Sequence, residues 1–218
     1  MSDRYVWLAL FALGCYHGLN PAMGWLFAVA LGYQERSLRA VLQAVVPITL
    51  GHVASVAPIV ALTAFAAVAL PHNAVHWAAA ALLLGFGIYR LVRARHPRWV
   101  GMRVGFWGLA WWGFLMAGAH GAGLMLVPFV TAVPRTRSDM SMPMPLSPAP
   151  HAPATGVPYL TAALMVAVHT LGYVVTMTAI AWLVYAKFGV GFLRRGWLNV
   201  DLVWALALIV AGVVALLT

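Results

Sequence analysis

Long apolar stretches fill most of the chain and alternate with short segments that hold arginine, glycine and proline. A helix of about 20 apolar residues crosses the hydrocarbon core of a bilayer. Backbone polar groups find no water in lipid, so long apolar crossing segments form helices. The sequence therefore predicts an all-α integral membrane protein with six transmembrane helices. These are expected at residues 5–31, 41–69, 75–94, 104–133, 157–186 and 200–217.

Composition agrees with this class. Of the 218 residues, 64% are hydrophobic and only 8% are charged, whereas soluble domains carry about 25% charged residues. The 13 basic residues outnumber the 4 acidic ones, but they lie between apolar runs, so the expected partner is the lipid bilayer and not nucleic acid. The single cysteine, Cys15, excludes an internal disulfide. The first run is too long for a cleaved signal peptide and is expected as a helix of the mature protein.

The arginines predict the orientation. Basic residues concentrate in cytoplasmic loops, and ten of the thirteen follow the first, third or fifth run. The prediction is a multi-pass protein of the cell (inner) membrane, with both termini outside or periplasmic and cytoplasmic loops at 32–40, 90–103 and 187–199. The ten residues are Arg36, Arg39, Arg90, Arg93, Arg95, Arg98, Arg103, Lys187, Arg194 and Arg195.

The two halves of the chain repeat the same features. "YHGLNPAMGW" in the first run is matched by "AHGAGLMLVP" in the fourth, and "LGHVASVAP" in the second by "AVHTLGYVV" in the fifth. Three runs per half is an odd number, so the halves must enter the membrane in opposite directions. We expect two inverted three-helix repeats, residues 1–103 and 104–218. The Pro-, Ser- and Met-rich loop at about 134–156 is expected to be disordered outside the membrane.

Each half carries one histidine in each of its first two runs, and no acidic residue lies in the interior of a run. At about 1.5 Å per residue, His17, His52, His120 and His169 all fall near the bilayer centre. Together with the thioether of Met23, they predict a midplane site for a soft or borderline cation such as Cu(I), Ni(II) or Zn(II). The alternative is that each imidazole only hydrogen-bonds a neighbouring helix.

A helix break is expected inside the first run. Asn20 and Pro21 interrupt the backbone ladder four residues after the first histidine, which would aim a bare carbonyl and Met23 into the same cavity. Met125 is expected to line this cavity from the second half. Pro47, Pro58 and Pro128 also lie inside runs, so kinks are expected, with the prolines facing the bundle interior.

A second group of donors lies on the predicted outer side. His72 and His76 are four residues apart at the start of the third run, close enough to share a metal on one helix face. His96, in "RARHPRW", is interpreted as an ordinary loop residue. The outer loop is either an inert linker or a metal-collecting segment. Its candidate ligands are Met140, Met142, Met144 and His151.

These motifs resemble a known family. "HGLNPAM" at 17–23 resembles the motif His-Gly-Leu-Asp-Pro-Asp-His of the nickel/cobalt transporter relatives, which include urease-accessory and sulfite-exporter-like membrane proteins of the lysine-exporter superfamily. "LGH" at 50–52 followed by "ASV" is similar to their second-helix motif Gly-His-Ser. The resemblance implies six helices in two repeats and carries over His17 and His52 as metal ligands. Asn20, Ala22 and Met23 replace two acids and a histidine, which removes hard ligands.

The preferred function is a secondary transporter of a transition-metal ion (Cu, Ni, Co or Zn), with export favoured by the resemblance. One alternative is an exporter of a small organic solute or anion. Others are a haem-binding membrane protein and an accessory protein that delivers copper. The chain carries no Ser-His-Asp set, His-Glu-x-x-His motif or phosphate-binding glycine loop, so no enzyme activity is expected. A homo-oligomer or a membrane partner is compatible with the sequence.

Overall fold

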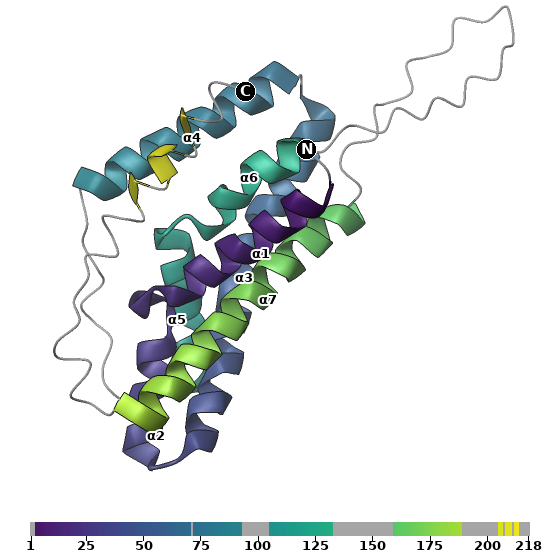
Figure 1. Cartoon of the computed structure of the whole chain (residues 1–218). Helices are drawn as coiled ribbons and strands as arrows, with labels where there is room; N and C mark the ends of the chain where they lie inside the picture. The colour runs from purple at the N-terminus through teal and green to yellow at the C-terminus, as the bar shows by residue number, and fades with distance from the viewer. Residues whose placement is uncertain are drawn as a thin grey trace, which may run out of the picture.

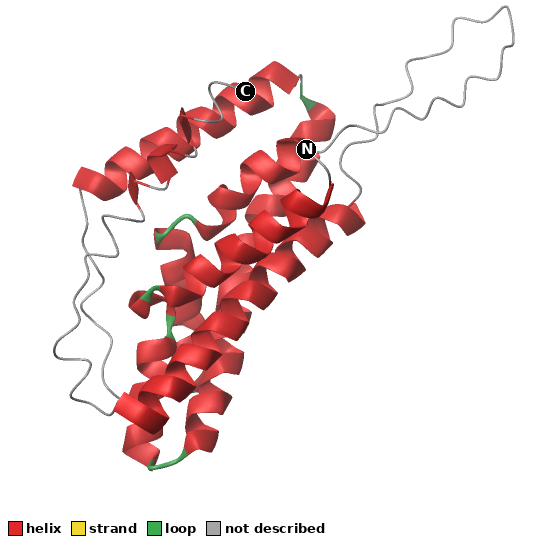
Figure 2. Ribbon diagram, viewed as in Figure 1, coloured by secondary structure: helices red, strands yellow, loops and turns green. Residues whose placement is uncertain are grey.

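The computed structural model describes residues 3–70, 72–92, 105–132, 159–188, 205–206, 208–210 and 212–213. Within these ranges all regular structure is helical and there is no strand, as predicted for the class (Figures 1 and 2). The elements are α1 (Asp3–Leu19), the 3₁₀ turn η1 (Pro21–Met23), α2 (Trp25–Glu35), α3 (Leu38–Ala69), α4 (His72–Val92), α5 (Phe106–Ala119), α6 (Ala122–Ala132), α7 (Tyr159–Leu183) and the π-helical turn η2 (Val184–Phe188).

Three of these helices are long and apolar enough to cross a membrane, at Leu38–Ala67, Ala74–Val92 and Tyr159–Lys187. The pair Phe106–Ala119 and Ala122–Thr131 makes a fourth if it counts as one span, bent by 55°. The first predicted run is divided into α1, η1 and α2. The sixth lies mostly outside the described residues, and so does the whole outer loop at 134–156.

The outer surface of the bundle is apolar. Leu62 of α3 is 68% exposed, Trp107 of α5 is 82% exposed and Leu160 of α7 is 71% exposed. A soluble monomer rarely exposes large apolar patches, but hydrocarbon solvates such side chains well. The polar side chains lie inside instead, and all four midspan histidines are completely buried.

Helices α1 and α7 run parallel to each other in direct backbone contact (Figure 1). A Cβ at Gly14 would collide with the backbone oxygen of His169, and one at Gly172 would collide with that of Phe11. Without water to drive association, helices in lipid depend on this kind of close approach between small residues. The crossing therefore depends on glycine from both helices.

Helices α3 and α5 form a second crossing of the same kind. A Cβ at Gly51 would collide with the backbone oxygen of Ala110, and one at Gly113 with that of Ile48. Each crossing joins a helix of the first half of the chain to a helix of the second half. The two halves are therefore interleaved along two parallel pairs.

Of the four prolines inside the predicted runs, only Pro21 lies at a break. Pro47 and Pro58 are inside the continuous helix α3, and Pro128 is inside α6. Pro47 is buried, but Pro58 is exposed, so the expectation that all four face the interior is wrong. An exposed proline ring is apolar and suits lipid. Since the other turns of a 32-residue helix stay bonded, α3 continues through both prolines.

One end of the bundle collects basic residues. The Tyr33 hydroxyl near the end of α2 donates to the backbone oxygens of Val184 and Tyr185 in η2, at 3.3 and 3.0 Å. Arg36, which ends α2 in a left-handed conformation, and Lys187 therefore lie at the same end. The N-terminus lies at the opposite end (Figure 1).

Arg90 differs from its prediction. It was assigned to a cytoplasmic loop that begins at residue 90, but α4 continues to Val92 and Arg90 is buried within it. The physical reason is a hydrogen bond, since Nη2 of Arg90 lies 3.3 Å from Nε2 of His120. A cationic side chain that binds a polar group inside the bundle is not a marker of the membrane surface.

The glycine crossings give a direct test of the fold. Gly51→Ala should lower the free energy of unfolding by about 1–3 kcal/mol, because the added methyl group meets backbone that cannot rotate away. Gly85→Ala in α4 is the matched control, since nothing lies within 4 Å of the added Cβ and alanine gains up to about 1 kcal/mol of helix propensity. Thermal unfolding in detergent measures both. Equal stability of the two variants would contradict the α3–α5 crossing.

Candidate functional site

The segment His17–Gly24 is a helix break with defined hydrogen bonds. The Asn20 amide N–H donates to the oxygen of His17 at 3.3 Å, and its side-chain oxygen accepts from the N–H of Ala22 at 3.0 Å. Gly24 then takes a φ of 127°, which L side chains rarely adopt. Asn20 and Pro21 therefore end α1 at Leu19, two residues after His17, and redirect the chain into α2.

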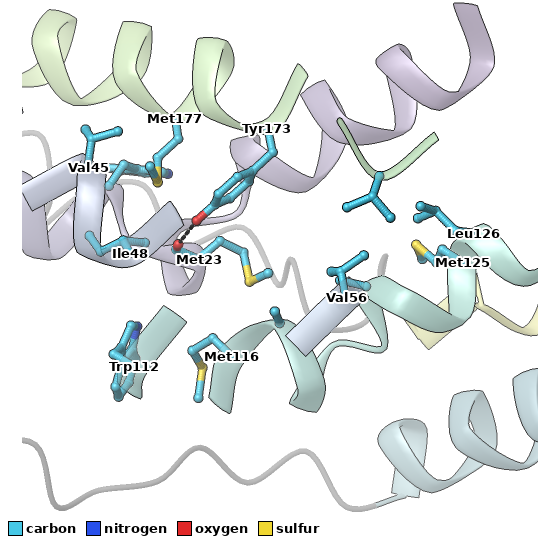
Figure 3. Packing of buried hydrophobic residues seen from close by; sticks show 14 of the residues in the cluster. Met23, Val45, Ile48, Val56, Trp112, Met116, Met125, Leu126, Tyr173 and Met177 are labelled. Carbon is cyan, nitrogen blue, oxygen red and sulfur yellow. Dashed lines mark hydrogen bonds between the residues drawn. The ribbon is translucent and has the colours of Figure 1, made fainter. Parts of the chain in front are cut away.

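The carbonyl groups that this break frees are bound by aromatic donors. The indole N–H of Trp25 donates to Leu19 at 3.2 Å, and that of Trp112 donates to Ala22 at 2.9 Å. The Tyr173 hydroxyl donates to the backbone oxygen of Met23 at 2.6 Å (Figure 3). The donors come from α2, α5 and α7, so the break is tied to three other helices. We call Leu19–Met23 with these three rings the break hub.

Three of the four midspan histidines lie together beside the break hub. The ring centroids are 5.1 Å apart for His17 and His52, 5.7 Å for His17 and His169, and 5.6 Å for His52 and His169. They come from α1, α3 and α7, and all three side chains are fully buried. We call these residues the histidine trio.

Tyr173 connects the histidine trio to the break hub. Its ring stacks on His52 with centroids 4.1 Å apart and an interplanar angle of 11°, and its centroid lies 5.8 Å from that of His17. The same side chain donates its hydroxyl to Met23. Tyr173 is therefore in contact with both the break and His52.

Both ring nitrogens of His52 are buried and make no hydrogen bond with the described residues, and the same holds for His169. The ring of His169 also interacts with the backbone of Leu10. An unsatisfied buried polar atom costs about 1–3 kcal/mol. Natural structures keep such atoms where a ligand, an ion or water meets them. His52 thus has hydrogen-bonding capacity that the described residues do not use.

His120 is not part of the trio, although it lies within electrostatic range of His17. It lies at the second break, where Gly121 takes a φ of 66° between α5 and α6. Its Nδ1 is 2.8 Å from the backbone oxygen of Met116, and its Nε2 faces Arg90. Arginine only donates, so Nε2 accepts and Nδ1 carries the proton. Both nitrogens of His120 are therefore used.

The residues that could take a metal are imidazoles and thioethers. Among the described residues no group of three or more His, Cys, Asp or Glu side chains is arranged to hold a metal ion as it stands. The trio rings are close, but a metal would require them to rotate so that their nitrogens meet. Met23 is buried and bonds the Tyr173 hydroxyl through its backbone oxygen, and Met116 is buried in the same cluster (Figure 3).

The other predicted donors are dispersed or lie outside the described residues. Met125 is buried in the first turn of α6. His76 is half-buried beside Trp77, with ring centroids 6.1 Å apart. Only the backbone of His72 is described, at the start of α4. The loop candidates Met140, Met142, Met144 and His151 lie outside the described residues.

Sequence reasoning missed Tyr173, Trp112 and Arg90. Tyr173 follows His169 by four residues, and this spacing places two side chains on one helix face, so it was detectable. Trp112 stands in the aromatic segment "FWGLAWWGF" at 106–114, and nothing in the sequence marks its indole as a donor to residue 22. Arg90 gave no signal, because it stands among four other arginines.

No protein-family model, curated protein or solved structure matches this chain.

The hydroxyl of Tyr173 is the part of the break hub that substitution tests most cleanly. Tyr173→Phe keeps the stack on His52 but leaves the Met23 oxygen without this donor, so unfolding free energy should fall by about 1–3 kcal/mol. Tyr89→Phe on the exposed face of α4 is the control, since Tyr89 is 56% exposed. Thermal unfolding in detergent compares them. A Tyr173→Phe variant as stable as the control would contradict the role of this bond.

Proposed function

We propose that this protein is a membrane transporter that carries a transition-metal ion through the histidine trio. The observation that carries the proposal is the trio itself. Three different helices each bury an imidazole at one point, and both ring nitrogens of His52 make no hydrogen bond with the described residues. Ionisable groups buried in a membrane span are costly and mark pathways or sites.

The ring spacing supports a metal as cargo. Imidazole nitrogens bind such ions at about 2.0–2.1 Å, so two rings on one tetrahedral ion have centroids about 5 Å apart. The trio centroids lie 5.1 to 5.7 Å apart. Rotation of the rings, without movement of the helices, is then enough to bring nitrogens from α1, α3 and α7 onto one ion.

An inverted repeat is part of the proposal. In both halves the first run breaks at or within three residues of the histidine of a His-Gly pair, at Asn20–Gly24 and at His120–Gly121. Each parallel pair, α1 with α7 and α3 with α5, joins a helix of the first half of the chain to a helix of the second half. A two-fold axis in the membrane plane would produce such pairs. Six spans, with the basic end in the cytoplasm, complete this arrangement.

Discontinuous helices are the usual carriers of substrate sites in such transporters. Here the first break has its freed carbonyls bound by ring donors, and it lies beside the trio. We propose that an ion enters and leaves by rearrangement at the break hub, with Tyr173 transmitting it to His52. The resemblance of "HGLNPAM" to the nickel/cobalt transporter relatives favours export as the direction.

Metal accumulation in cells tests the function. If the protein exports metal, its expression should lower the cellular content of the transported metal. His52→Gln or His169→Gln should make this decrease at least about tenfold smaller. His96→Gln, at a loop position of the sequence, is the histidine control. Elemental analysis of washed cells measures the content, with variant protein in the membrane fraction quantified alongside.

Loss of the effect in both trio variants, with the control active, supports the proposal. Accumulation that is unchanged in both variants would show that the trio does not carry the metal. The absorption spectrum of the purified protein is an independent check, because a Soret band would assign the histidines to haem instead.

A further inference from the structure

The charges of the side chains around the trio indicate which ions it would bind. Resting on the proposed function, we infer that the trio is selective for a soft monovalent cation, Cu(I) with Ag(I) as its analogue, over the divalent ions Zn(II), Ni(II) and Co(II). The inference follows from the lack of a buried carboxylate among the described residues and from the thioethers in the buried cluster that also contains Tyr173.

No carboxylate is buried among the described residues. Their buried polar and charged side chains are His17, Asn20, His52, Ser55, Arg90, His120 and His169. Glu35 is exposed at the end of α2, and Asp3 precedes His17 by about 21 Å of helix. The other two acids of the chain lie outside the described residues. The described surroundings of the trio therefore bring no negative charge to a bound ion.

The free energy needed to remove an ion from water rises with the square of its charge. The desolvation free energy of a dication is therefore about four times that of a monocation of equal size. Dications in proteins recover this cost largely through anionic ligands, carboxylate or thiolate. Neutral imidazoles and thioethers offer dipoles only. A site made of these groups in lipid therefore favours the monocation.

The sulfur donors act in the same direction. Met23, Met116 and Met177 are fully buried in the cluster that contains Tyr173 (Figure 3). Thioether ligands select Cu(I) over the harder divalent ions. Met23, the last residue of "HGLNPAM", lies at the break itself, and its backbone oxygen accepts a hydrogen bond from Tyr173. The ion that leaves the trio through the break thus passes thioether donors and no carboxylate among the described residues.

The test compares cations on full-length purified protein. Other soft donors in the sequence would bind silver, so the background carries Cys15→Ser together with Met140→Leu, Met142→Leu and Met144→Leu. Isothermal titration in detergent with Ag(I), and with Cu(I) held by a competing chelator, should show one equivalent. Zn(II), Ni(II) and Co(II) should bind at least about 100-fold more weakly, because the trio lacks an anionic ligand.

The variants locate the site. His52→Gln in this background should weaken Ag(I) binding by at least about tenfold, and His96→Gln should leave it unchanged. The cation series keeps all three histidines of the trio, so it decides the question even if His52→Gln does not fold. Equal or tighter binding of a divalent ion would overturn the selectivity but leave the proposed transport of metal intact. Absence of binding by every cation would overturn both.

Discussion

A broken helix inside lipid survives only if the protein itself binds the backbone groups that the break releases. Here three aromatic rings do so, and each comes from a different helix: Trp25 from α2, Trp112 from α5 and Tyr173 from α7. The break after His17 therefore fixes how these helices are placed around the end of α1. Removing one donor would leave a buried carbonyl unpaired, a larger loss than that of an apolar contact.

The two glycine crossings bring the imidazoles together. Gly14 and Gly172 let α1 and α7 touch backbone to backbone, which places His17 and His169 side by side, and Gly51, next to His52, brings α3 against α5. Small residues at these points allow the distances of 5.1 to 5.7 Å between rings. The glycines at the crossings thus allow both the close backbone packing and the short distances between the histidine rings.

Sequence patterns predicted the helical class well because hydrophobicity reports burial in lipid directly. The second run, expected at 41–69, is α3 at Leu38–Ala69. The break at Asn20–Pro21 was readable since proline lacks a donor. The break at His120 was not, because Gly121 causes it through a positive φ, and a glycine in an apolar run gives no such signal. Pro128, which suggested a kink, lies inside a continuous α6.

Depth along a helix can be counted from the sequence, but the direction of a side chain around the helix depends on its neighbours. This explains why three histidines of four were placed correctly relative to one another. His120 lies at the second break, where Arg90 and the Met116 carbonyl use both of its nitrogens. These contacts tie α4 to the end of α5 at the α5–α6 break. The ring of His17, beside the first break, instead faces His52 and His169. Two histidines that each precede a glycine and lie near a helix break therefore have different surroundings, and only one of them belongs to the trio.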